Sequence, residues 1–178
     1  MTTLLLARHG ETDWNREGRW QGWADPPLND TGRSQARRLA EELQAIPFDA
    51  VYSSDLRRAH ETAEILAAPH RVPVVADRGL REIDIGSWSG LTRAEITERF
   101  PDGSRPDGET HEEHGARVRE AVVRIARGHL GGRILLVGHG GTIRSVHDVI
   151  SDLPYHPVPN CHVLEAHFRD DRLAAPIG

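Results

Sequence analysis

The sequence contains no lysine, so all 22 of its basic residues are arginines. A Walker-type phosphate loop needs its lysine to reach the phosphates, and Schiff-base catalysis needs a lysine amine, so both are excluded. Any phosphate chemistry must use arginine, whose planar guanidinium binds phosphate oxygens through parallel hydrogen bonds. The formal net charge of −5 argues against general binding to nucleic acid or to an anionic membrane.

Cysteine and long apolar runs are also scarce. The single Cys161 cannot form an intrachain disulfide or a cysteine metal cluster, and we interpret it as a small buried residue of the last strand. No apolar run approaches the roughly 18 residues of a membrane span. The apolar start, Met1 to Ala7, is too short for a signal peptide and lacks a basic region. A cytoplasmic location is the default expectation that follows.

The 178 residues suffice for one domain, and two kinds of apolar pattern alternate along them. Short apolar runs predict strands, and apolar residues three or four apart predict amphipathic helices. The predicted strands are 4–7, 49–53, 72–75, 133–137 and 161–168; the predicted helices are about 31–46, one capped by Asp55, 91–100, 111–130 and 142–150. This alternation predicts an α/β fold: a three-layer α/β/α sandwich with a mostly parallel central sheet, in a single domain over residues 1–178.

Two segments share one layout, in which an apolar strand runs directly into His-Gly-x-Thr. They are Arg8-His9-Gly10-Glu11-Thr12 and Gly138-His139-Gly140-Gly141-Thr142. Ligand sites in open α/β sheets lie beyond the carboxyl ends of the strands, so turns on neighbouring strands would bring His9 and His139 together. Glycine lets the backbone approach a ligand closely, and the helix after the second turn offers free N–H groups to an anion. One histidine at a strand end is usually structural, but two in matching turns indicate a functional site.

These turns resemble those of the histidine phosphatase superfamily, also called the phosphoglycerate mutase-like family. Further motifs match it in the same order, over about residues 3–168. They are Trp14-Asn15, Gly22-Trp23, Asp25, Pro27-Leu28, Thr31 to Ala36, Ser53 to Ala59 with Thr62-Ala63, and Leu80-Arg81-Glu82 with Gly86, Trp88 and Gly90. The resemblance implies a phosphoglycerate mutase-like fold and is closest to the small bacterial phosphatases of the family.

The resemblance also implies a phosphohistidine mechanism. His9 would attack phosphorus as a neutral imidazole, a form that nearby arginines favour by charge repulsion. Arg8, Arg58 and His139 would surround the phosphoryl oxygens and stabilise the charge spread over them in the transition state. Glu82 would protonate the leaving alkoxide and then deprotonate the attacking water. An acidic-to-neutral pH optimum is expected, because the first step needs a protonated Glu82 and a neutral His9.

The same match predicts which residues line the phosphate pocket, and which of the adjacent arginines Arg57 and Arg58 belongs to the site. Thr12, Asn15, Gln21, Gly22 and the backbone of Gly140 would line the pocket. The family motif places its arginine immediately before an alanine, which selects Arg58 over Arg57. No metal and no cofactor are expected.

The reaction and the substrate are less determined. Mutases of this family are longer and carry extra basic residues in a cap, whereas the cap predicted here, about 83–114, has no adjacent arginine pair, and the chain ends about ten residues after the last predicted strand. We therefore expect hydrolysis of a small phosphorylated metabolite, with mutase activity as the alternative. An α-ribazole phosphatase, a broad-specificity acid phosphatase and a glycosyl-phosphoglycerate phosphatase all stay open, and the resemblance also allows a homodimer.

Other interpretations of individual residues stay open too. Trp20, Trp23 and Trp88 are candidates for stacking on a sugar or base, or for packing. His111 and His114, three apart on a predicted helix, would suit zinc, although a solvated helix start is the simpler interpretation. A binding domain that keeps the fold without catalysis is a further possibility. Arginines 33, 37 and 38 would suit nucleic acid, but Glu41 and Glu42 at i,i+4 spacing indicate a solvated helix face.

Overall fold

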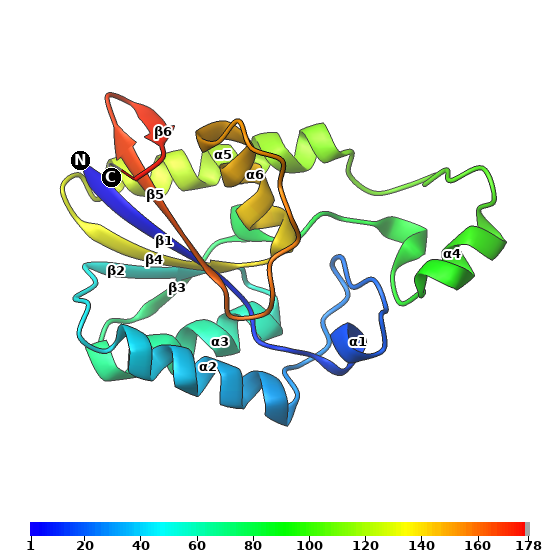
Figure 1. Ribbon diagram of the computed structural model, residues 1–178, viewed down its shortest axis with the longest axis horizontal. Helices are drawn as coiled ribbons and strands as arrows, with labels where there is room; N and C mark the ends of the chain where they lie inside the picture. The colour runs from blue at the N-terminus through cyan, green and yellow to red at the C-terminus, as the bar shows by residue number, and fades with distance from the viewer. Residues whose placement is uncertain (177–178) are drawn as a thin grey trace.

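The computed structural model describes residues 1–176, so the last two residues of the single domain predicted over 1–178 lie outside the described range. Six strands form one sheet in the order β3-β2-β4-β1-β5-β6 (Figure 1). The strands are β1 (Thr2–Arg8), β2 (Ala50–Ser53), β3 (Val74–Ala76), β4 (Arg133–Gly138), β5 (Val163–Arg169) and β6 (Arg172–Ala174). The first four pair in parallel, whereas β5 and β6 are antiparallel to their neighbours. The sheet is therefore mostly parallel, as predicted.

Helices cover both faces of this sheet, which confirms the α/β class and the layered architecture (Figure 1). Helices α2 (Asp30–Leu43) and α3 (Arg57–Ala67) lie on one face, and α5 (His111–Gly128) and α6 (Gly140–Ile150) lie on the other. The short helices α1 (Asp13–Arg16) and α4 (Arg93–Arg99) lie beyond the carboxyl ends of the strands. Single 3₁₀ turns occupy Ala68–His70, Arg78–Leu80 and Gly86–Trp88.

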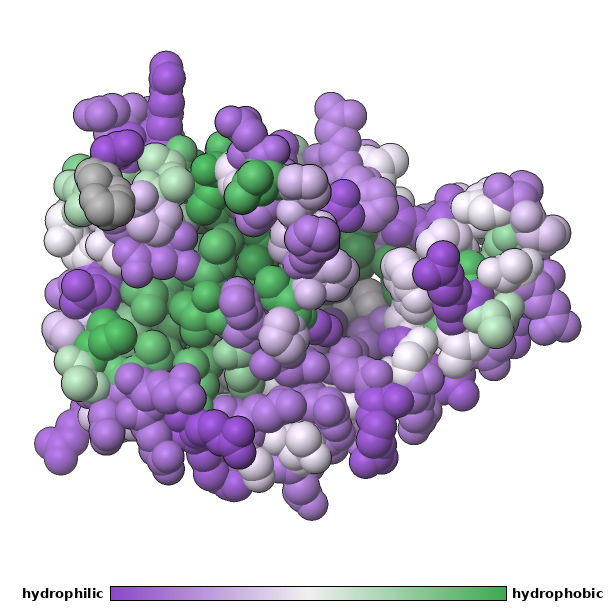
Figure 2. Space-filling model, in the orientation of Figure 1, coloured by the Kyte–Doolittle hydropathy of each residue, from purple (hydrophilic) through white to green (hydrophobic). Residues whose placement is uncertain are grey.

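The middle of each central strand, β1 and β4, is apolar because both of its faces are buried. Leu4 and Leu6 of β1 pack into the core under α5 and α6, whereas Leu5 and Ala7 pack into the core under α2 and α3. Successive side chains of a strand point to opposite faces, so a strand between two helical layers needs an unbroken apolar run. Figure 2 shows the apolar residues gathered over the strands and hydrophilic residues over α2.

Two of our predictions about single residues were wrong. Asp55 does not cap α3, whose N-cap is Leu56 without a side-chain hydrogen bond. The carboxylate of Asp55 instead accepts two hydrogen bonds from Arg81, at 2.6 and 2.7 Å. This pairing of two charged groups is stronger than a hydrogen bond from an uncharged backbone N–H at a helix start. Cys161 lies outside β5, in a turn with a φ of 57°. Burial raises the pKa of its thiol to about 11, which leaves it protonated and unreactive at neutral pH.

The segment between β1 and α2, predicted as loop, contains the single turn α1. Thr12 and Asn15 cap it reciprocally, each side chain accepting a hydrogen bond from the other's backbone N–H. Helix α6 begins two residues earlier than predicted, at Gly140, where the hydroxyl of Thr142 accepts a hydrogen bond from the backbone nitrogen of the N-cap residue His139 at 3.1 Å. Among the described residues, no helix combines the length and the apolar character needed to cross a bilayer.

A close backbone contact between the loop after β1 and the first turn of α2 fixes the position of that loop. A Cβ added to Gly32, in the first turn of α2, would lie 2.6 Å from the backbone nitrogen of Glu11. A Cβ added to Gly10 would lie 3.0 Å from the Cα of Gly32. Only glycine at both positions allows the loop after β1 to rest directly on α2.

We expect Gly32→Ala to lower the free energy of unfolding by about 1–3 kcal/mol, because the new methyl group must displace backbone atoms. Urea denaturation measures this change. Gly128→Ala is the matched control, because a Cβ at that helical position meets nothing within 4 Å. Its effect should be neutral or stabilising, by up to about 1 kcal/mol. Equal stability of the two variants would contradict the contact.

Candidate active site

The pairing of β1 with β4 brings the two histidine turns together. The register places Arg8 opposite Gly138, so that the next residues, His9 and His139, leave the sheet side by side. The backbone nitrogen of His9 donates to the carbonyl of Gly138 at 2.9 Å. The two imidazole rings meet edge to face, with centroids 5.2 Å apart. Both histidines lie at the carboxyl ends of central strands, where open α/β sheets bind ligands.

His9 is buried, and its protonation is set by its neighbours. Its Nδ1 lies 2.7 Å from the carbonyl oxygen of Gly10. A carbonyl only accepts, so Nδ1 carries the ring proton and Nε2 carries the lone pair. Burial, followed by the positive charges of Arg58 and Arg8, holds the pKa of His9 well below its ordinary value. At neutral pH His9 is thus an uncharged imidazole, the form that a nucleophile requires.

Arg58 supplies a fixed positive charge beside His9. Its side chain lies in the first turn of α3 at 0% exposure, whereas Arg57 is exposed. The guanidinium donates to the carbonyls of Ala24 and Gly22, at 2.7 and 2.8 Å. Burial lowers the pKa of Arg58 to about 10, so the group remains charged at neutral pH. Of the two adjacent arginines, Arg58 is the one that lines the cavity.

Several buried nitrogen atoms around His9 have no hydrogen-bond partner within residues 1–176. They are the Nε atoms of Arg8 and Arg58 and both ring nitrogens of His139. Burial first, and then the charge of Arg58, lowers the pKa of His139 well below its ordinary value. Buried polar atoms in proteins nearly always have partners, so such a cluster marks a place for an oxygen-rich ligand.

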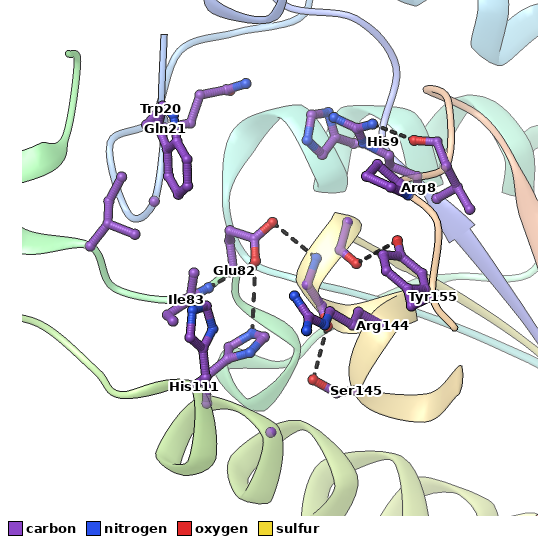
Figure 3. A pocket seen from close by; sticks show the side chains of 18 of the residues that line it. Arg8, His9, Trp20, Gln21, Glu82, Ile83, His111, Arg144, Ser145 and Tyr155 are labelled. Carbon is purple, nitrogen blue, oxygen red and sulfur yellow. Dashed lines mark hydrogen bonds and ion pairs between the residues drawn. The ribbon is translucent and has the colours of Figure 1, made fainter. Parts of the chain in front are cut away.

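Glu82 enters the cavity from another wall than His9 (Figure 3). Its carboxylate accepts hydrogen bonds from the backbone nitrogens of Ile83, at 3.0 Å, and Gly141, at 3.2 Å. Its own carbonyl accepts from Trp23 Nε1 at 2.8 Å and from Arg117 at 3.2 Å. Backbone and side chain of Glu82 are therefore both held in place.

The segment around Glu82 is held by side chains to which the sequence analysis assigned no role. Arg117 of α5 pairs with Glu109 through two hydrogen bonds of 2.7 and 2.6 Å. Arg117 also donates to the carbonyls of Gly79 and Arg81. The Arg81–Asp55 pair fixes the residue before Glu82, and the hydrogen bonds of Arg81 hold the pKa of Asp55 below its ordinary value. The motif Gly108-Glu109-Thr110 was the signal that could have indicated this support.

The residues predicted to line a phosphate pocket divide into two groups. Asn15, Gln21, Gly22 and Gly140 line the same cavity as His9, whereas Thr12 is buried behind it as the cap of α1. The Oε1 atom of Gln21 is buried without a partner in the described part of the chain. Gly22 adopts a φ of 49°, which places its carbonyl on Arg58 and favours glycine.

The cavity has a volume of about 560 Å³. Of the three tryptophans considered, Trp20 lines it. Trp88 packs edge to face on Trp20, with centroids 5.6 Å apart, and Trp23 stacks under the guanidinium of Arg81. Arg119 and Arg144 add positive charge to the wall of the cavity.

The segment that we interpreted as a solvated helix start does begin α5 with exposed residues at positions 111–113, but His114 is buried. Its side chain is 4% exposed, and its Nε2 lies 3.8 Å from Glu82 Oε1 in the cavity wall. His111 also lines the cavity, one turn away. Over residues 1–176, no group of three or more His, Cys, Asp or Glu side chains is arranged to hold a metal ion. Asn160 is another residue that we missed: its Nδ2 donates to the carbonyl of His9 at 2.9 Å.

Comparison with known proteins agrees with this fold. Residues 4–175 match the family model of the histidine phosphatase superfamily (branch 1). The chain belongs to this superfamily.

Individual relatives carry both phosphatase and mutase names. The chain is 37% identical over 151 residues to the uncharacterized phosphatase PhoE of Bacillus subtilis, covering 85% of this chain and 78% of that protein. It is 42% identical over 159 residues to the phosphoglycerate mutase-like protein 4 of Arabidopsis thaliana, covering 82% and 69%. The solved structure of Bacillus stearothermophilus YhfR superimposes with a TM-score of 0.90 at 34% identity, covering 99% of this chain and 96% of that one.

The buried neutral histidines predict a loss of stability in acid. Burial lowers the pKa of His9 and His139 in the folded protein, whereas in the unfolded chain each protonates near its ordinary pKa of about 6.5. As the pH falls through that value, the unfolded state therefore takes up protons that the folded state does not. The free energy of unfolding should fall by up to about 1.4 kcal/mol per pH unit for each histidine.

Urea denaturation at a series of pH values from about 7 down to about 5 measures this slope. In His139→Gln, which has one ionisable ring fewer, the slope should decrease by up to one proton equivalent. An unchanged slope in that variant would show that His139 does not resist protonation.

Proposed function

We propose that the protein hydrolyses a small phosphomonoester through a phosphohistidine intermediate on His9, without a metal ion. The observation that carries this proposal is the cluster of buried nitrogens of Arg8, Arg58 and His139, which have no hydrogen-bond partner among residues 1–176, near a neutral imidazole. A phosphoryl group has three oxygens that accept hydrogen bonds, and it needs cationic donors in fixed positions. The superfamily membership supports the same reaction class.

In the first step, Nε2 of His9 attacks phosphorus and the bond from phosphorus to the ester oxygen breaks. Glu82 gives its proton to the departing alkoxide, so that a neutral alcohol leaves. In the second step, a water molecule attacks the phosphohistidine, and Glu82 takes a proton from it. The phosphorus–nitrogen bond breaks, inorganic phosphate leaves, and both His9 and Glu82 return to their initial states.

The charged groups contribute mainly by being in place before the reaction. Arg58 cannot rotate away, because two backbone carbonyls hold its guanidinium. Arg8 is tied in the same way to the carbonyl of Val158. Donors that need no reorganisation stabilise the negative charge of the transition state more strongly than water does.

Phosphoryl transfer of the mutase type is the second candidate, because a relative named as phosphoglycerate mutase-like shares 42% of its aligned residues with this chain. We favour hydrolysis because the cap is small and Trp20, in the cavity wall, remains 42% exposed. Water can then reach a phosphohistidine before the alcohol returns to it. Incubation with 3-phosphoglycerate separates the two reactions, since hydrolysis releases inorganic phosphate and transfer yields an isomer.

The first prediction concerns His9. The wild-type protein should hydrolyse p-nitrophenyl phosphate in the presence of EDTA, and His9→Ala should lower kcat by more than about a thousandfold. Rapid quenching at alkaline pH should trap an acid-labile phosphoenzyme in the wild type, and none in the variant. Full activity of His9→Ala would exclude the mechanism, and activity that EDTA abolishes would exclude its metal independence.

The second prediction uses the adjacent arginines as a matched pair. Arg58→Gln should lower kcat by about 10²–10³, because it removes one preorganised donor from the transition state. Arg57→Gln, at an exposed position of the same helix, should change kcat by less than about twofold. Steady-state kinetics on both variants measure the difference, and similar losses in the two would argue against a specific role of Arg58.

A further inference from the structure

His114 lies against the carboxyl group of Glu82, and the mechanism above gives it no task. It occupies the second turn of α5, which Thr110 and Glu113 start with a capping box. Its Nε2 is buried, has no hydrogen-bond partner within residues 1–176, and lies 3.8 Å from Glu82 Oε1.

The space for this contact exists because residue 141 is glycine. A Cβ on Gly141 would collide with Glu82 Oε1 and would lie 2.8 Å from Cε1 of His114. The start of α6 thus admits the carboxyl group and the imidazole together. The backbone nitrogens of Ile83 and Gly141 hold the carboxyl group, but an amide N–H neither takes up nor returns a proton near neutral pH.

The other charged or titratable side chains that act on Glu82 do not exchange protons near neutral pH. Arg8 and Arg58 face it with positive charge, and arginine keeps its proton in proteins. Tyr155 also faces it, but burial raises the pKa of the phenol. Among these side chains, only the imidazole of His114 exchanges a proton in the neutral range.

We propose that His114 is a positioning residue that shares one proton with Glu82, between Nε2 and Oε1, and so keeps the acid of the reaction protonated at neutral pH. This inference rests on the role of Glu82 in the proposed function. The two atoms lie 3.8 Å apart in the structure and must approach to hydrogen-bond distance to share the proton. In one form the carboxylic acid then donates to the lone pair of Nε2; in the other, an imidazolium donates to the carboxylate. An isolated glutamic acid, with a pKa of about 4.3, would have lost the proton at neutral pH.

The groups around His114 are consistent with a proton held by the pair. Burial lowers the pKa of His114, and the negative charge of Glu82 raises it, so the ring prefers its charge only while Glu82 is ionised. Arg117 and Glu109 also face the ring, but they pair with each other at 2.6 Å and their charges offset. His139 faces it from the start of α6 and is held neutral by burial.

The proton balance closes over the two steps. The pair begins with one proton, which passes from Glu82 to the leaving alkoxide as the phosphorus–oxygen bond breaks. The pair then holds no proton, and Glu82 is a carboxylate beside a neutral His114. The attacking water returns one proton to the pair as the phosphorus–nitrogen bond breaks, so no further reactant is needed.

The kinetic test compares two leaving groups across about pH 5 to 8, the range in which histidine titrates. Glycerol phosphate releases an alkoxide that must be protonated, whereas p-nitrophenolate leaves without a proton. For glycerol phosphate, His114→Phe and His114→Gln should lower kcat at pH 7 about tenfold with little change in KM. Both should also move the alkaline limb of the profile about one unit toward acid. For p-nitrophenyl phosphate the loss should be less than about twofold.

Glutamine can restore a hydrogen bond to Glu82 but cannot carry a proton, so rescue by His114→Gln would show a merely structural role and overturn the proposal. His162→Gln, an exposed imidazole outside the cavity wall, is the control and should behave as the wild type. Equal losses on both substrates would also overturn it. A wild type that hydrolyses neither substrate would instead refute the proposed function.

A second readout does not depend on activity. Titration of the His114 ring by NMR should show that Glu82→Gln lowers the pKa of His114 by about one unit, because the charge that favours the imidazolium is gone. An unchanged pKa would mean that the two groups do not share a proton, whether or not the enzyme is active. The expected decrease would support the pair even if the natural substrate remained unidentified.

Discussion

The guanidinium of Arg58 lies entirely out of water, and two backbone carbonyl groups keep it there. A buried charge without partners would destabilise the fold by several kcal/mol. The surrounding chain must therefore place hydrogen-bond acceptors around the guanidinium. The loop from Trp20 to Ala24 takes a left-handed turn at Gly22 to aim its carbonyl groups at Arg58. That loop also delivers Gln21 and Trp20 to the cavity wall. One buried cation thereby determines the course of a whole side of the site.

The rest of the site also combines buried positive charge, on the arginines, with histidines that are kept neutral. Arg8 and Arg58 remain charged, while burial and these charges suppress protonation of His9 and His139. Such a site repels cations and attracts anions. It therefore suits the dianionic phosphate group of the phosphomonoester that we propose as substrate. Within the described residues, the carboxylate of Glu82 is held by the backbone nitrogens of Ile83 and Gly141 and not by these two arginines.

The parts of this arrangement that sequence reasoning could predict were those with local signals. The two turns at His9 and His139 follow apolar strands, and the pairing of β1 with β4 then brings them together. The contacts that it could not predict join segments far apart in the chain. The capping potential of Asp55 was visible locally, but its partner Arg81 comes from another loop. The burial of His114 depended on Glu82 and Gly141, which only the folded chain brings to α5.

The contact from Asn160 to the carbonyl of His9 spans 151 positions of the chain. The pairings of β1 with β4 and β5 likewise join the beginning of the sequence to its last third. Contacts of this kind form slowly, because a long loop must close before any interaction compensates for the lost chain entropy. His9 thus precedes, by up to 151 positions, residues that surround it in the folded protein. A nascent chain that does not yet include β4 therefore carries His9 without the burial that holds its imidazole neutral.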